Sequence, residues 1–315
     1  MMNFDGKVLA LTGGVGGAKL ARGLIECLAT EQLLIVANTG DDFSHLGLSI
    51  SPDLDSVMYA LADLNDPERG WGLAGESWQA MDALKQLGGA DWFRLGDRDL
   101  STHLQRSVRL SEGAPLSQVT GELCTALGLR HALVPMTDDR VSTMVSTAQG
   151  ELTFQEYFVR EQCVPAVSGF RFDGIESARP LPQLMEWLGA PDLSAVIICP
   201  SNPFVSVDPI LSLPGVREAL QSSSAAVVAV SPIVGGMAIK GPAAKMMQEL
   251  NMPATAVAIA EWYGELLDGL IIDSVDRELA ASITTATRVL PTLMSDLGSK
   301  VQLAREALDF ARHLD

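Results

Sequence analysis

Short apolar runs alternate with helical patterns along much of the chain. Val8–Thr12 and Leu33–Ala37 are mostly apolar, and the segment between them resumes as a helical pattern after a glycine-rich turn. A strand, a helix and a second strand in this order are typical of a parallel sheet that is buried on both faces. Similar runs recur at Ala195–Cys199, Ala225–Val230 and Leu270–Ile272. We therefore expect an α/β fold with a Rossmann-like, doubly wound, mostly parallel sheet.

The middle of the chain departs from this alternation. After several helical patterns, short apolar runs follow one another with only turn residues between them, which favours antiparallel pairing over residues 130–175. We expect one domain over 1–315, with an inserted antiparallel and helical subdomain at about 65–175 that lies over the active site. The expected elements are helices at Ser77–Leu87, within 100–128 and at Ser299–Leu314, and strands at His131–Pro135, Val141–Thr147 and Glu151–Phe154.

The composition narrows the class of protein. The chain has 315 residues, of which 47% are hydrophobic and 19% charged, so it is long enough to bury a full core. Its net charge of −17 opposes general nucleic-acid binding. No stretch approaches about eighteen uninterrupted apolar residues, so we expect no membrane span. The N-terminus runs almost directly into the first strand, which favours a cytoplasmic protein without a signal peptide. The four cysteines contain no CxxC pair and indicate neither zinc nor disulfides.

A glycine-rich segment follows the first strand. Backbone N–H groups at the start of the next helix can approach a phosphate closely there, and Lys19 adds a positive charge one turn further on. Ala18 and Leu20 around the lysine exclude a standard P-loop, and Lys19 stands where a dinucleotide fingerprint needs a small residue. We expect a nucleotide or phosphate site rather than a turn that only lets the helix pack on the strand. Its candidate residues are Gly13, Gly14, Val15, Gly16, Gly17 and Lys19.

Four carboxylates follow the second strand, near the edge of the sheet where ligands bind. Helix capping explains Asp53 well. Asp41, Asp42 and Asp55 are harder to explain in that way. Because Mg²⁺ takes one or two carboxylates together with water or phosphate oxygens, this group suits a metal or a polar substrate. The alternative is a solvated turn.

Two later strands also end in polar turns. Ser201 and Asn202 stand between two prolines, and Ser231 precedes a third. We expect these turns to meet the glycine-rich segment at one nucleotide crevice. The alternating charges around Arg94 are either a self-paired surface or a guanidinium site for phosphate or a planar ring. Trp71, in an irregular loop, either covers a flat ligand or packs in the core.

These motifs together resemble the 2-phospho-L-lactate transferase (CofD) family of coenzyme F-420 biosynthesis, and the resemblance covers nearly the whole chain. Each motif is weak alone, but seven in the same order with similar spacing are specific. They are Thr12–Lys19, Asn38–Asp42, Ser51–Asp55, Arg69–Gly72, Leu95–Asp99, Pro200–Pro203 and Ser231–Ile233.

The resemblance implies a reaction and a distribution of roles. A phospho-acid joined to GMP through a diphosphate would be transferred to the ribityl hydroxyl of the deazaflavin Fo, and GMP would leave. The acid remains open among phospholactate, phosphoenolpyruvate and phosphoglycerate, and a homodimer is expected. By this resemblance the glycine segment, Ser201, Asn202 and Ser231 bind the guanine nucleotide (GMP or GDP), Asp41, Asp42 and Asp55 serve catalysis and bind Mg²⁺, and Asp55, Arg94 and Arg98 contact Fo.

Two other functions compete with this one. A nucleotide-sugar-binding regulatory protein would share the glycine turn and the sheet, but a passive binder would not need the acidic motifs around Asp41 and Asp55. An NAD(P) oxidoreductase would carry an acidic residue at the end of the second strand, where Ala37 and Asn38 stand instead.

Overall fold

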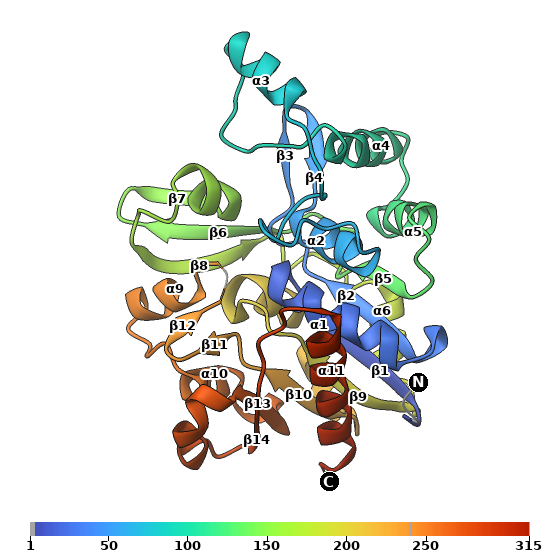
Figure 1. Ribbon diagram of the computed structural model, residues 1–315, viewed down its shortest axis with the longest axis vertical. Coiled ribbons are helices and arrows are strands. Elements are labelled where there is room, and N and C mark those ends of the chain that lie inside the picture. Colours follow the sequence, from blue (N-terminus) through green and yellow to red (C-terminus); the bar gives the residue numbers. More distant parts are fainter. Residues whose placement is uncertain (1–3, 240, 315) are drawn as a thin grey trace.

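A seven-stranded parallel sheet forms the centre of the molecule in a computed structural model, which describes residues 4–239 and 241–314 (Figure 1). The strands run in the order β14-β13-β10-β9-β1-β2-β5, and each neighbouring pair is parallel. This confirms the expected fold class. The strands are β1 (Lys7–Thr12), β2 (Leu33–Ala37), β5 (Ala132–Pro135), β9 (Leu193–Ile198), β10 (Ala226–Val230), β13 (Gly269–Asp273) and β14 (Ala286–Leu290).

The strand order reverses once, beside β1. The chain runs outward from β1 through β2 to β5 at one edge, then returns to place β9 against the other side of β1. From β9 it runs outward again through β10 and β13 to β14. In such sheets the loops diverge at the reversal and leave a crevice at the carboxyl ends of the strands. The fold therefore places the ligand crevice between the ends of β1 and β9.

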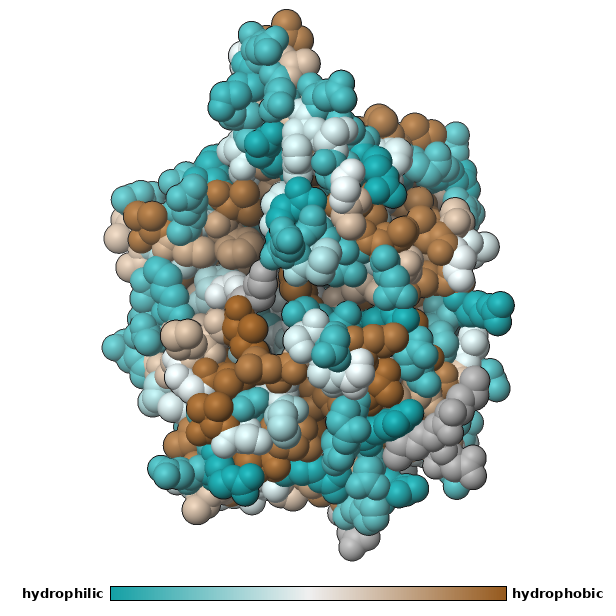
Figure 2. Space-filling view, in the orientation of Figure 1, coloured by the Kyte–Doolittle hydropathy of each residue, from teal (hydrophilic) through white to brown (hydrophobic). Residues whose placement is uncertain are grey.

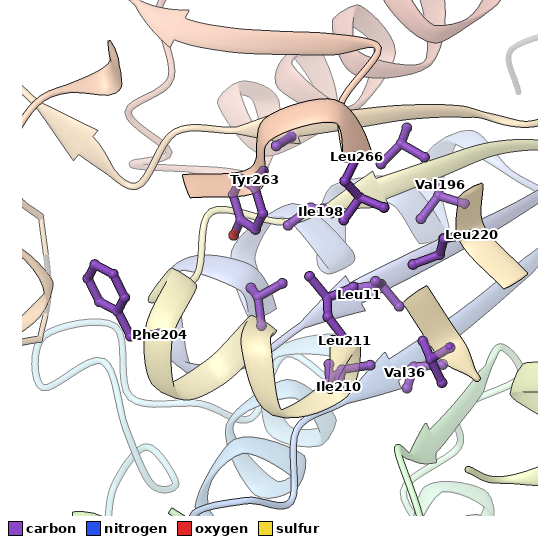
Figure 3. Close-up of a cluster of buried hydrophobic side chains, with 14 of the residues drawn as sticks. Leu11, Val36, Val196, Ile198, Phe204, Ile210, Leu211, Leu220, Tyr263 and Leu266 are labelled. Atoms are coloured by element: carbon purple, nitrogen blue, oxygen red, sulfur yellow. The ribbon is translucent and has the colours of Figure 1, made fainter. Parts of the chain in front are cut away.

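Alternate residues of each strand enter two separate cores. Leu9 and Leu11 of β1 belong to one core, and Val8 and Ala10 belong to the other. Figure 3 shows Leu11 in the first core. That core includes side chains of α6 (Pro182–Leu188), α7 (Asp208–Leu211), α8 (Val216–Ser222), α9 (Ala243–Glu249) and α10 (Ala256–Tyr263). The second core includes side chains of α1 (Gly14–Cys27), α2 (Pro52–Leu61), α5 (Leu116–Ala126) and α11 (Leu297–Arg312).

Residues 132–135 correct one expectation. The strand predicted there is present as β5, but it pairs parallel with β2 in the central sheet instead of joining an antiparallel addition. Its side chains enter both cores, with Leu133 in one and Val134 in the other, so pairing with β2 buries both of its faces. The region 65–175, expected as an insert, thus contributes the strand β5 to the central sheet. The boundaries of the inserted subdomain stay a prediction.

Three small antiparallel sheets lie outside the central sheet. The expected antiparallel strands after β5 are confirmed as one sheet of order β7-β6-β8, and two short hairpins complete the set. Their strands are β3 (Phe43–His45), β4 (Leu48–Ile50), β6 (Ser142–Thr147), β7 (Gly150–Thr153), β8 (Val167–Asp173), β11 (Ile233–Val234) and β12 (Met237–Ala238).

Helix α3 (Gln79–Gln86) lies beyond the β3–β4 hairpin and forms a projecting tip, whereas α4 (Asp99–Ser111) lies beside the hairpin (Figure 1). Figure 2 shows that the surface of this tip is mostly hydrophilic. Shorter helical turns complete the chain at Thr30–Gln32, Glu156–Arg160, Pro203–Val207, Gly264–Leu266 and Ser274–Ser282. Within the described ranges, no helix has the length and apolar character needed to cross a bilayer.

Candidate active site

The loops after β1 and β9 meet at the strand-order reversal. The Gly13 amide donates a hydrogen bond to Ser201 Oγ at 3.1 Å, which joins the two loops directly. Helix α1 begins at Gly14, so the glycine-rich segment forms the first turn of the helix instead of a separate loop before it. Gly13 stands at the N-cap and provides no side-chain cap for the N–H groups of that turn. Apart from the Gly14 amide, which hydrogen-bonds Asp53, these amides are therefore the donors that an anion would use.

Most of these glycines are also required by close packing. A Cβ on Gly16 would overlap the carbonyl oxygen of Pro200, and one on Gly17 would overlap the side chains of Thr12 and Ser201. Gly14 instead needs its positive φ of 64°. The glycines of this segment therefore serve both interpretations of the sequence. They allow α1 to pack closely on the neighbouring loops, and they leave the backbone accessible to a phosphate.

A cleft of about 530 Å³ runs along this edge of the sheet. Its volume is within the range of small-molecule sites. Of the candidate residues, Gly17, Asp42 and Arg98 are not among those that line it. The cleft is lined by the candidates Gly13, Gly14, Val15, Gly16, Lys19, Asp41, Asp55, Arg94, Ser201, Asn202 and Ser231.

Two buried carboxylates share one amide group at the base of the cleft. Asn38 Nδ2 donates to Asp41 Oδ1 at 3.2 Å and to Asp53 Oδ2 at 3.0 Å. Gln155 Nε2 donates to the other oxygen of Asp41 at 2.8 Å. Asp53 does not cap α2, because the helix begins at Pro52 and Ser51 stands at the N-cap. Asp53 is instead part of the acidic site.

Burial makes these carboxylates bind protons more tightly. It raises the pKa of Asp53 to about 6, although hydrogen bonds from Asn38 and the Gly14 backbone act in the opposite direction. Burial also raises the pKa of Asp41 well above its ordinary value, and the charges of Asp53 and Asp42 raise it further. The pKa of Asp42 is raised by burial despite a hydrogen bond from Ser51. A cation bound here would offset the cost of burying these like charges.

The chemistry of these donors fits Mg²⁺ in part. Asp41 lines the cleft, and Asp42 Oδ1 is buried without a hydrogen-bond partner. Across residues 4–239 and 241–314, however, no group of three or more His, Cys, Asp or Glu is arranged to hold a metal ion. Since Mg²⁺ binds through one or two carboxylates and completes its shell with water and phosphate oxygens, a site here would depend on the bound substrate.

Asp55 has a different environment from the other three carboxylates. Arg106 Nη1 donates to Asp55 Oδ2 at 3.0 Å, and Nη2 donates to Oδ1. His103 Nδ1 lies 3.7 Å from Asp55 Oδ2. Neither Arg106 nor His103 is among the site residues predicted from the sequence. The signal that could have found them is their spacing on α4 together with Asp99.

The two arginine candidates differ in position. Arg94 lines the cleft, donates to Asp82 at 2.9 Å and lies 4.9 Å from the centre of the Trp78 ring. Arg98 Nη1 donates to the carbonyl of Ala74 at 2.8 Å. The structure therefore brings Arg94 to the site and directs Arg98 to the neighbouring loop.

The remaining polar candidates also stabilise the loops that carry them. Asn202 Oδ1 accepts from the Phe204 amide at 3.0 Å, and Ser231 Oγ donates to the Ile233 carbonyl at 3.1 Å. Lys19 Nζ donates to the Met294 carbonyl at 3.1 Å, on the segment before α11. Asn202 and Ser231 thus fix their own turns locally, and Lys19 connects α1 to a segment far along the chain.

Fold and site together define a Rossmann-like α/β protein with one cleft at the strand-order reversal, where helix-terminal amides face buried carboxylates. Residues 8–297 match the sequence profile of the family described as 2-phospho-L-lactate transferase CofD. The chain belongs to this family and is an enzyme of the CofD transferase type, whose members act in coenzyme F-420 biosynthesis.

Named relatives cover most of the chain. A phosphoenolpyruvate transferase of Streptomyces coelicolor is 40% identical over 98% of this chain and 99% of its own length. A 2-phospho-L-lactate transferase of Methanosarcina mazei is 38% identical over 86% of this chain and 88% of its own length. A UPF0052 family protein of Bacillus halodurans matches in structure with a TM-score of 0.64 at 16% identity, over 96% of this chain and 99% of its own. That likeness supports the fold alone.

Proposed function

We propose that this enzyme transfers a phosphoenolpyruvyl group from a guanylylated diphosphate donor to the ribityl hydroxyl of the deazaflavin Fo, with release of GMP. Family membership supports the transfer of a phospho-acid. The phosphoenolpyruvyl donor is supported by relatives named phosphoenolpyruvate transferase, which match 97–98% of the chain. The single observation that carries the proposal is the cleft that joins the α1 N-terminus to the buried carboxylates.

The donor fits the side of the cleft formed by the ends of β1 and β9. First-turn amides of α1 would bind the diphosphate, which the helix dipole also favours. Lys19 and Ser201 line the cleft beside them, and Asn202 and Ser231 line it near the expected guanosine. Fixed donors of this kind stabilise the charge that develops on phosphate oxygens during transfer.

The acceptor fits the side formed by α2, α4 and the aromatic loop residues. Asp55 would accept a hydrogen bond from the ribityl hydroxyl and orient it toward phosphorus. The hydroxyl oxygen forms the new P–O bond, the bond from that phosphorus to the GMP oxygen breaks, and the hydroxyl proton leaves to a carboxylate or water. Trp71 and Arg94 line the cleft on this side and offer a surface for the flat ring.

Asp41 and Asp42 are the proposed Mg²⁺ ligands, with Asp53 beside Asp41 and Asp55 as a further candidate. When bound, Mg²⁺ would neutralise charge on the transferred phosphate group. A homodimer is also part of the proposal, and sedimentation analysis of the purified protein tests it.

The deciding experiment is incubation of the protein with Fo, Mg²⁺ and each guanylylated donor in turn: phosphoenolpyruvyl, phospholactyl and phosphoglyceryl. Mass analysis of the deazaflavin should show the phosphoenolpyruvyl product and GMP, and chelation of Mg²⁺ should stop its formation. A product only with another acid would correct the donor. Unmodified Fo with all three donors would overturn the transferase proposal.

A further inference from the structure

Helices α2 and α4 meet through buried polar side chains. Asp99, His103 and Arg106 occupy positions i, i+4 and i+7 of α4, a spacing that places them on one face. Asp55 and Tyr59 occupy positions i and i+4 of α2. All five side chains are buried, and Arg106 is only 1% exposed. We refer to these five residues as the α2–α4 seam.

Arg106 holds both oxygens of Asp55. Nη1 donates to Oδ2 at 3.0 Å, and Nη2 donates to Oδ1. A planar guanidinium that binds both carboxylate oxygens fixes the orientation of the carboxylate as well as pairing its charge. Burial lowers the pKa of Arg106, but the Asp55 carboxylate together with the charge of Asp42 raises it above its ordinary value, so the guanidinium stays charged.

The guanidinium is itself held in place by His103. Arg106 Nη1 lies 3.3 Å from His103 Nδ1. Because an arginine only donates, Nδ1 is the acceptor in this contact. Nε2 lies 3.3 Å from Asp99 Oδ2, while Tyr59 Oη donates to Asp99 Oδ1 at 2.6 Å. The hydrogen bond between Tyr59 and Asp99 thus joins α4 to α2 a second time, four residues after Asp55.

We propose that Arg106 is a positioning residue that holds the Asp55 carboxylate in the orientation in which it meets the acceptor hydroxyl. This role rests on the proposed function, in which Asp55 contacts the acceptor. Asp55 lines the cleft, whereas Arg106 is not among the lining residues and acts through Asp55. A reacting group that is misplaced by about 1 Å can lose about 100-fold in rate, so the fixed orientation matters for the chemical step.

The test is Arg106→Lys, which keeps the charge but not the planar pair of donors. With wild-type transfer measured in parallel, we expect kcat to fall by about 100-fold, an effect typical of misplacement. Donor nucleotide affinity should stay within about threefold, because the seam lies on the acceptor side. The matched control is Arg109→Lys on the same helix, where Arg109 pairs at the surface with Glu122 at 2.9 Å. Its kcat should equal that of the wild type.

Thermal melting separates this role from a merely structural one. If Arg106→Lys keeps the wild-type kcat, or loses nucleotide affinity and melting temperature together with kcat, the positioning role is wrong. Should Arg106→Lys fail to fold, His103→Leu removes the acceptor at Nδ1 while leaving the Arg106–Asp55 pair. About a tenfold loss of kcat at unchanged nucleotide affinity then supports the role, and no loss overturns it. If the wild type is inactive with all donors, the proposed function is wrong and this role falls with it. If the wild type is active, the result for the variants tests the role of Arg106 alone.

Discussion

Gly16 shows at the level of one residue how tightly the loops of the site are packed. The missing Cβ leaves the space that the Pro200 carbonyl oxygen occupies. Because the neighbour is backbone and not a flexible side chain, a larger residue here must displace the loop after β9. Loop geometry and the nucleotide site therefore depend on the same atoms.

We predict that Gly16→Ala lowers the free energy of unfolding by about 1 to 3 kcal/mol, the usual cost of overpacking, despite the higher helix propensity of alanine. Urea denaturation measures this. The matched control is Gly121→Ala in α5, where a Cβ would meet nothing within 4 Å. That change should raise the free energy of unfolding by about 0.5 to 1 kcal/mol. Equal effects of the two substitutions would contradict the packing argument.

Asp53 makes the stability of the protein depend on pH. Burial raises its pKa from the ordinary 3.8 to about 6, so the folded state holds this proton more tightly than the unfolded state. Between these two values the folded state binds more protons, and its stability falls as pH rises. Above pH 6 the full cost of burying the ionised Asp53 carboxylate lowers the stability, and below pH 3.8 this cost is absent.

We predict that ionisation of Asp53 lowers the free energy of unfolding by about 2 to 3 kcal/mol between pH 4 and 7. Asp53→Asn should remove that part of the pH dependence. The quantity to measure is the wild-type minus Asp53→Asn difference in unfolding free energy by urea denaturation, without added Mg²⁺. A difference that stays constant across this range would refute the assignment.

At the scale of elements, the aromatic loop before α3 forms one wall of the cleft. Trp71 is 44% exposed and lies edge-on to Trp78 with ring centres 6.1 Å apart. Arg69 lies 5.4 Å from the centre of the Trp71 ring. An exposed indole that lines a cleft offers stacking area at low ordering cost.

We predict that Trp71→Ala weakens Fo binding by about tenfold, or 1.4 kcal/mol, and leaves guanine nucleotide binding unchanged. Trp71→Phe should retain most of the affinity because it keeps an aromatic face. Calorimetric titration of each variant with Fo and with GDP measures both affinities. Wild-type Fo affinity in the alanine variant would remove Trp71 from the acceptor site.

Local patterns predict the elements better than they predict the pairing of the elements. The run Leu33–Ala37 is a strand with the expected bounds, because a continuous apolar stretch between turns leaves few alternatives. The turns around residues 132–135 favour an antiparallel addition, yet the partner of β5 is β2. Nothing in a local window records a partner so distant along the chain.

In the site, too, local features could be predicted from the sequence and contacts between distant elements could not. Glycine and serine at strand ends could be predicted to meet, since parallel strands end at one edge of a sheet. The contacts of Asp53 with Asn38 and of Asp55 with Arg106 could not, because they depend on how α2 and α4 pack. Helix capping is a sufficient local explanation for Asp53, so the sequence gives no sign that this residue lies beside Asp41.

At the scale of the molecule, the two substrates would contact different parts of the chain. Nucleotide candidates come from the ends of β1, β9 and β10, whereas acceptor candidates come from α2, α4 and the loop between them. These parts meet only along the cleft. Each ligand should therefore protect its own set of backbone amides.

We predict that GDP slows amide hydrogen exchange in residues 13–19 and 200–206, and that Fo slows it in residues 65–98. Both ligands together should protect both sets. Exchange measured by mass spectrometry on peptides tests this, with peptides of α8, which contributes no residue to the cleft lining, as an internal reference. Protection of residues 65–98 by GDP alone would contradict the division of the cleft.

The position of β1 at the centre of the sheet has a consequence for biosynthesis. β1 ends at Thr12 and is therefore made well before its neighbour β9, which does not begin until Leu193. Until then one edge of β1 exposes backbone N–H and C=O groups with no strand to pair with, and such edges attract other chains. The nascent chain is thus exposed to aggregation until β9 has been made, and chaperones that shield the residues between β1 and β9 should raise its yield.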